Sequence, residues 1–209
     1  MAPRPDRSSA NTKILNAALM VIRARGYGAT TVDDLCAASG VTKGAFFHHF
    51  NSKVDLAVAA AEHWSKVTGE LFARAPYHRH ADPLERVLGY LDFRKQLLTG
   101  DVGEFTCLVG TMVQETFESS PAIRAACEAS ISGHAAKIET DITEAMRQRG
   151  LCAEWTAKSL ALHTQVVVQG AFILAKAKDD AKIAAASIDH LRRYIEDLFS
   201  PTNQKGKRP

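Results

Sequence analysis

Residues 31–50, TVDDLCAASGVTKGAFFHHF, decide the fold of this 209-residue chain. The Thr31 hydroxyl and the Asp34 carboxylate have the spacing of a capping box, which predicts the start of a short helix. Gly40 ends that helix after about two turns, because glycine adopts the positive φ that a tight turn between helices requires. A second short helix, 42–50, follows at once. Together the three elements predict helix-turn-helix geometry.

The second of these helices is unusual for a purely structural element. Gly44 costs about 1 kcal/mol relative to alanine in a helix interior, which makes sense where the backbone must approach another surface closely. Phe46 and Phe50, spaced i and i+4, are expected to face a small core. A lysine and an aromatic ring on the outer face suit the major groove of DNA, where lysine reaches guanine acceptors and a ring edge touches a thymine methyl. The outward-facing residues are then Lys43, Gly44, Phe47 and His48.

The rest of the chain is helical by periodicity. Apolar residues predict a first helix from Ser9 or Asn11 to Gly26 and a fourth helix from about residue 52 to about residue 75. A linker at 76–83 separates them from the remainder. Five amphipathic helices are expected there, over 83–99, 103–118, 120–149, 153–178 and 180–199. No segment alternates with period two for long enough to predict a sheet, so the expected fold class is all-α, with about nine or ten helices.

Composition excludes several classes of protein. The chain is 46% hydrophobic and 23% charged, as soluble globular domains are. The longest nearly apolar run, 166–175, contains Gln169 and is half the roughly 20 residues that a bilayer requires. The N-terminal stretch lacks the apolar segment of a signal peptide, and the four cysteines show no C-x-x-C spacing, which suits free thiols in a reducing compartment. Cytoplasmic localisation without a membrane partner is therefore expected.

The net charge of +3 is unevenly distributed. Residues 1–66 hold eight Lys or Arg against five Asp or Glu, and residues 67–200 hold fifteen against eighteen. The segment 201–209 adds three basic residues and is expected to be a disordered tail. A mildly basic first third permits binding to a polyanion, but this charge alone does not establish it.

Motifs for catalysis, cofactors and metals are absent from the sequence. It contains no P-loop, dinucleotide fingerprint, G-x-S-x-G or H-E-x-x-H, and the lack of Glu-x-x-His disfavours a di-iron carboxylate bundle. His48 and His49 are adjacent on a helix and point about 100° apart, which disfavours a shared metal ion. His78 and His80 lie in the linker, where chance surface placement explains them better. We therefore expect a protein that is not an enzyme and has neither cofactor nor metal.

The segments ILNAAL (14–19), RGYGATTV (25–32) and ASGVTKGAFFHHFNSKVDL (38–56) resemble the TetR family of one-component transcriptional regulators in order and spacing. The resemblance implies an N-terminal three-helix helix-turn-helix domain (1–50), a connecting helix (51–75) and a helical ligand-binding and dimerisation domain (76–200). It also implies a function. The protein would be a homodimeric repressor that leaves a palindromic double-stranded operator when a small molecule binds.

The resemblance also places the DNA-binding residues. The recognition positions are Thr42, Lys43, Gly44, Ala45, Phe47, His48 and His49, with Thr31 and Lys53 on phosphates. The sequence departs from the family pattern in three places. Phe47 stands where tyrosine is commonest, so a phosphate hydrogen bond is lost while ring contact can persist. Asp33 would put a carboxylate near phosphates, and Cys36 replaces a small packed alanine.

The expected helix 153–178 has little polar face and must be covered on nearly all sides. Burial inside one chain is one explanation. The other is a two-fold four-helix interface with the last helix or with 120–149, using the small-residue patch at 169–171. The residues expected in that interface are Val166, Val167, Gly170, Ala171, Leu174, Leu191 and Ile195.

A ligand pocket is expected in the larger domain, lined by large side chains that are individually explained as well by core packing. The candidates are Trp64, Tyr90, Phe93, Met112, Phe117 and Trp155. With no charge cluster that must be buried, an apolar or aromatic inducer with one polar handle is expected. The alternative function is a helical small-molecule-binding protein or enzyme with a vestigial helix-turn-helix.

Overall fold

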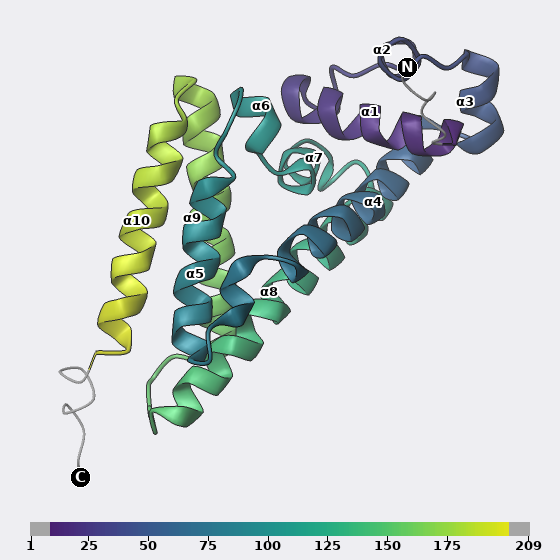
Figure 1. The fold of residues 1–209 in the computed structure, drawn as a ribbon. Helices are drawn as coiled ribbons and strands as arrows, with labels where there is room; N and C mark the ends of the chain where they lie inside the picture. Colours follow the sequence, from purple (N-terminus) through teal and green to yellow (C-terminus); the bar gives the residue numbers. More distant parts are fainter. Residues whose placement is uncertain (1–8, 201–209) are drawn as a thin grey trace, which may run out of the picture. The chain divides into compact units, whose positions relative to one another are not determined.

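A computed structural model describes residues 9–200, and in this part the chain forms ten α-helices, one short 3-10 helix and no strand (Figure 1). The expected all-α class is confirmed. The basic tail expected at 201–209 lies outside the described residues. The helices are α1 Ala10–Arg25, α2 Val32–Ser39, α3 Lys43–His49, α4 Lys53–Ala73, η1 Pro76–Arg79, α5 Pro83–Gln96, α6 Val102–Phe105, α7 Leu108–Thr116, α8 Pro121–Gln148, α9 Ala157–Lys178 and α10 Ala181–Leu198.

The helices group into two compact units, and each unit is built from two separate stretches of the chain. Within the described part, unit 1 comprises residues 9–67 and 107–130, and unit 2 comprises residues 68–106 and 131–200. Helices α4 and α8 therefore each contribute residues to both units. The functional division expected from the sequence, with boundaries at residues 50 and 75, stays a prediction.

Most helix ends follow the local chemistry that the sequence indicates. Thr31 and Asp34 form the expected capping box at the start of α2, and Gly40 ends that helix in the left-handed conformation, with φ 68°. At the other end of the chain, Asp179 adopts φ 49° after α9. The side chain of Asp180 then caps α10.

The structure corrects the expected linker and two of the expected helices. The linker 76–83 contains the single 3-10 turn η1. The expected helix 103–118 is interrupted at Cys107, whose extended backbone and side-chain cap on Gly110 N start a new helix. Helix α9 begins at Ala157 instead of residue 153, because Thr156 and Ser159 form a capping box.

Unit 1 packs α2, α3 and α7 against α1. The fully buried side chains include Ile14 and Ile22 of α1, Leu35 of α2 and Phe46 of α3. Met112 of α7 is also completely buried. The helix-turn-helix therefore shares its unit with a helix that follows it by more than 50 residues.

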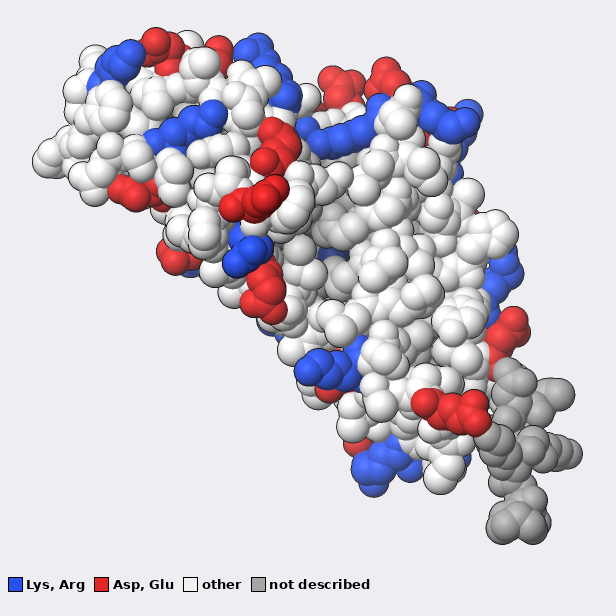
Figure 2. All heavy atoms as spheres, turned by 180° about the vertical axis from the view of Figure 1, so that it is seen from behind, with Lys and Arg blue, Asp and Glu red and all other residues white. Residues whose placement is uncertain are grey.

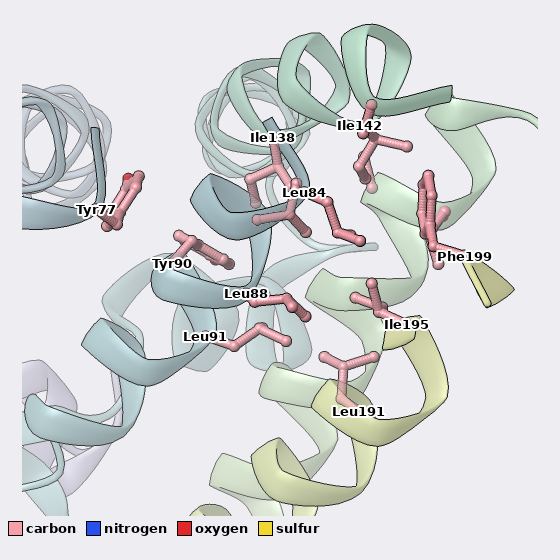
Figure 3. Packing of buried hydrophobic residues seen from close by; sticks show 14 of the residues in the cluster. Tyr77, Leu84, Leu88, Tyr90, Leu91, Ile138, Ile142, Leu191, Ile195 and Phe199 are labelled. Carbon is pink, nitrogen blue, oxygen red and sulfur yellow. The ribbon is translucent and has the colours of Figure 1, made fainter. Parts of the chain in front are cut away.

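Unit 2 has its own core, formed where α5, α8, α9 and α10 meet (Figure 3). The core residues labelled there on α5, α8 and α10 include Leu84, Leu88, Leu91, Ile138, Ile142, Leu191 and Ile195. Helix α9 is the one helix within residues 9–200 long and apolar enough to cross a membrane, with mean hydropathy 1.3. About 44% of that window is buried inside the protein. Its inner face also carries the buried polar residues Thr164 and Gln165.

Candidate DNA-binding surface and ligand cavity

Helix α3 presents the face that the sequence predicts. Phe46 and Phe50 are buried, whereas Phe47 between them is 50% exposed. The Thr42 hydroxyl caps α3 by accepting a hydrogen bond from the backbone of Ala45 at 3.1 Å. Burial of Phe46 and Phe50 therefore fixes the orientation of the helix, and its outer side remains exposed to solvent. The exposed residues on that side are Thr42, Lys43, Gly44, Phe47, His48 and His49.

Gly44 is not required by packing inside the protein. The nearest atom to a Cβ built at this position is Thr42 Oγ1, 3.9 Å away. Its backbone has none of the positive φ that favours glycine. A glycine that is exposed and unstrained agrees with a need for close approach by another molecule.

Lys43 and Asp33 form an exposed ion pair across the helix-turn-helix. Lys43 Nζ lies 2.9 Å from Asp33 Oδ1, and the two side chains are 59% and 74% exposed. Asp33, which the sequence places near phosphates, is thus paired with Lys43, which is expected to contact a base. Exposed pairs contribute about 0 to 1 kcal/mol, so DNA can displace this contact.

Lys53, the expected phosphate ligand, lies against the loop between α1 and α2. Its ammonium sits 4.2 Å from the centre of the Tyr27 ring. Burial lowers the pKa of Lys53, and the nearby Glu115 carboxylate acts in the opposite direction. The lysine is therefore held by a ring contact at the first turn of α4.

Glu115 of α7 holds the same loop through two backbone hydrogen bonds. The amide of Tyr27 donates to Oε1 at 3.0 Å, and the amide of Gly28 donates to Oε2 at 2.6 Å. A Cβ at Gly26 would lie 2.7 Å from Oε1, and Gly26 also has φ 89°. Sequence reasoning missed Glu115 because 88 residues separate it from Tyr27 and no local pattern joins them.

A cavity of about 190 Å³ opens within unit 2. Apolar walls come from Phe72, Val87 and Ile138, and polar atoms come from Tyr77, Tyr90 and His134. Figure 3 shows Tyr77 and Tyr90 next to each other, and their ring centroids are 6.0 Å apart. The remaining lining residues are Ala73, His78, Lys137 and Asp141.

The structure separates the six residues expected to line a pocket. Tyr90 lines the cavity of unit 2. Phe93 packs edge-on against Phe72 with ring centroids 5.4 Å apart, and Trp155 packs against Phe199 at 5.7 Å. The other three lie in unit 1: Trp64 beneath the Arg23 guanidinium, Met112 fully buried, and Phe117 56% exposed. The pocket residues that the sequence did not single out, such as Tyr77 and His134, are brought together by the fold.

Helix α9 carries an exposed apolar stripe, defined by the exposed residues Leu162, Val166, Ile173 and Leu174 with the half-buried Gly170 among them. Figure 2 shows a largely uncharged surface over α9 and α10 on that face. Val166, 66% exposed, and Leu174, 51% exposed, lie in the expected interface. Val167 is partly buried against its own core. Three other expected interface residues, Ala171, Leu191 and Ile195, are buried in the core of the same chain.

These features define a helix-turn-helix DNA-binding regulator. Residues 14–60 match the family described as "Bacterial regulatory proteins, tetR family", and residues 83–187 match "Transcriptional regulator LmrA/YxaF-like, C-terminal domain". The chain belongs to the TetR family of DNA-binding transcriptional regulators, as the sequence resemblance predicts.

Relatives and solved structures agree with this assignment. The HTH-type transcriptional regulator LmrA of Bacillus subtilis (strain 168) is 28% identical over 90% of this chain and 95% of LmrA. The transcriptional regulator AcuR of Cereibacter sphaeroides is 29% identical over 53% of this chain, which spans about half (51%) of AcuR. Solved regulators from Rhodobacter sphaeroides and Chloroflexus aurantiacus J-10-FL each have a TM-score of 0.78, at 23% and 24% identity. Those matches cover 90% of this chain and 99% and 94% of the two structures, and they show the shared fold.

Proposed function

We propose that this protein is a homodimeric cytoplasmic repressor that a small molecule releases from a palindromic operator. The observation that carries the proposal is that one helix, α4, holds an expected DNA-binding residue at its start and residues of the cavity wall at its end. The helix runs without interruption over Lys53–Ala73. Its first residue is the expected phosphate ligand Lys53, and its last turn supplies Phe72 and Ala73 to the cavity wall.

The exposed residues of α3 support operator binding. Lys43, Phe47 and His48 lie on one exposed side, with an unstrained glycine among them. In this proposal Lys43 reads a base in the major groove, while Thr31 and Lys53 bind phosphates and fix the position of α3. Thr42, Ala45 and His49 complete the contact surface.

The exposed stripe of α9 supports the homodimer. A two-fold axis would place the same stripe of a second copy against it and would present two recognition helices to DNA. Half-sites on one face of B-DNA are about 34 to 36 Å apart, so the operator would be roughly palindromic with that spacing. Release then follows if a ligand in the cavity displaces the last turn of α4 and, through its first turn, the recognition helix.

The alternative, a ligand-binding helical protein or enzyme with a vestigial helix-turn-helix, makes a different prediction for DNA. A gel shift of the purified protein on its own upstream DNA, with competitor DNA present, separates the two. A specific shift that a small molecule reverses supports the repressor. No specific shift at low salt would support the alternative.

A further inference from the structure

The guanidinium of Arg94 lies half-buried in unit 2 without a carboxylate partner among residues 9–200. Its Nε donates to the Tyr90 hydroxyl at 2.9 Å, and its Nη2 lies 3.0 Å from His134 Nε2. The Phe72 ring covers the guanidinium carbon at 4.6 Å. All of these partners are uncharged, so the positive charge is not neutralised, and its field is weakly screened away from bulk water.

Arg94 also determines which nitrogen of His134 carries the proton. Arginine has only donors, so His134 Nε2 must accept the hydrogen bond, and the ring is neutral with its proton on Nδ1. Burial and the charge of Arg94, with a smaller effect of Lys137, lower the pKa of His134 to about 3. His134 is therefore a neutral donor at physiological pH.

Two donors at the cavity have no partner of their own. In the described part of the chain, Nδ1 of His134 and the hydroxyl of Tyr77 have no hydrogen-bond partner. The one fully buried side-chain oxygen or nitrogen without a hydrogen bond in that part is Thr106 Oγ1. The two cavity atoms are therefore not fully buried, and a ligand can reach them. Both residues line the cavity.

The charges around the cavity favour an anion. Asp141 is the one carboxylate among the lining residues, and Arg86 neutralises it at 2.7 Å. Lys137, three residues beyond His134 on α8, is exposed and has no ion pair within residues 9–200. Arg94 contacts Tyr90 and His134, so the positive charges around the cavity outnumber the negative ones.

The size of the cavity limits the ligand to a compact molecule. Its volume of about 190 Å³ is comparable to the roughly 150 Å³ of an engineered apolar cavity that binds benzene. Phe72, Val87 and Ile138 supply apolar walls, to which an aromatic ring is complementary.

We propose that this cavity binds an aromatic carboxylate of one or two rings, whose oxygens accept hydrogen bonds from His134 Nδ1 and the Tyr77 hydroxyl under the charge of Arg94. This proposal rests on the proposed function, because the carboxylate would be the inducer. The sequence predicts an inducer with one polar group of unspecified kind, and this proposal makes that group an anionic carboxylate. Arg94 acts here as a positioning residue for His134 and as the source of the field.

Calorimetric titration of the full-length protein with naphthalene-2-carboxylate and with its neutral isostere 2-naphthamide tests the proposal. We expect the carboxylate to bind at least tenfold more tightly than the amide. Arg94→Gln should reduce this ratio about tenfold, and Tyr77→Phe should weaken carboxylate binding several-fold. Lys95→Gln is the matched control, because Lys95 is the next residue on α5 and pairs with Asp189 instead. It should leave the ratio unchanged.

Equal affinity of the wild-type protein for the two compounds, or binding of neither, would overturn the proposal without any variant being needed. A separate gel shift with each compound distinguishes this failure from failure of the proposed function. A preference for the carboxylate that depends on Arg94, without release of DNA, supports the cavity assignment and rejects ligand-driven release. Release by a different compound, in a protein that shows no preference for the carboxylate, rejects the cavity assignment alone.

Discussion

Lys43 and Lys53 are both near the recognition helix, but under the proposed function they contact DNA differently. Lys43→Ala should cost about 1 to 3 kcal/mol and relax the preference at one base pair of each half-site. Lys53→Ala should weaken binding to all sequences equally and lower the salt slope by about one unit, because one phosphate contact is lost. Fluorescence anisotropy on operator variants at several salt concentrations measures both effects. Identical sequence profiles for the two variants would contradict the assignment of Lys43 to the groove.

His134 makes stability depend on pH. Its pKa is about 3 in the folded protein and about 6.5 in the unfolded chain, so the unfolded chain binds more protons between these values. The free energy of unfolding should therefore fall as the pH is lowered from about 6.5 towards 3. At pH 5 we expect a loss of about 1 to 2 kcal/mol relative to pH 7.

Urea unfolding at pH 7 and pH 5 measures this loss. His134→Gln should reduce it, whereas His48→Gln, at an exposed histidine of α3, should leave it unchanged. An equal pH dependence in all three proteins would show that His134 becomes protonated without cost in the folded state.

At the scale of single elements, α3 carries a glycine that the helix itself does not need. Gly44→Ala should raise stability by up to about 1 kcal/mol, because alanine favours the helix, and it should weaken operator binding by obstructing the close approach. Gly133→Ala is the matched control, since Gly133 is an exposed glycine inside α8 with nothing within 4 Å of its Cβ position. Thermal unfolding and anisotropy report the two effects. If the two variants bind DNA equally well, close approach at Gly44 is not needed.

The exposed stripe of α9 is the second element with a direct test. Val166→Glu should shift the protein from dimer to monomer, because a carboxylate would be buried without a partner in the interface. Gly170→Leu should act in the same direction, since a Cβ there meets no atom of its own chain within 4 Å. Sedimentation velocity measures the shift, with Ala136→Glu on the exposed face of α8 as control. Unperturbed dimers for both variants would move the interface away from α9.

Elements were predictable from the sequence where their determinants are local. The capping box at Thr31, the turn at Gly40 and the burial of Phe46 each depend on neighbours within four residues. The interruption of the helix at Cys107 was not predictable, because the periodic apolar pattern continues across it. Long-range contacts were also out of reach. The contact of Glu115 with the α1–α2 loop and the network of His134 with α5 join residues 40 or more positions apart, and no periodic pattern encodes them.

At the scale of the whole molecule, the proposed release depends on α4 acting as one stiff rod. Replacing Val58 and Ala59 by glycine should lower the helical preference of its middle by about 1 to 1.5 kcal/mol. Operator binding and ligand binding should each remain measurable, while ligand-induced release is lost. Thermodynamic reciprocity adds a second readout, because operator DNA should then no longer weaken ligand binding. Val58→Ala is the control for side-chain loss. Full release in the glycine variant would reject α4 as the connection.

The discontinuous composition of unit 1 has a consequence for biosynthesis. Residues 9–67 leave the ribosome well before residues 107–130, which supply α7 and the Glu115 hydrogen bonds to the α1–α2 loop. At about 5 to 20 residues per second, the intervening residues 68–106 take roughly 2 to 8 s to synthesise. During that interval the face of α1 that α7 covers has no partner from its own unit. The unit that begins the chain is therefore completed only after residues 107–130 have been made, and a nascent chain lacks the finished DNA-binding unit until more than half of the chain has been synthesised.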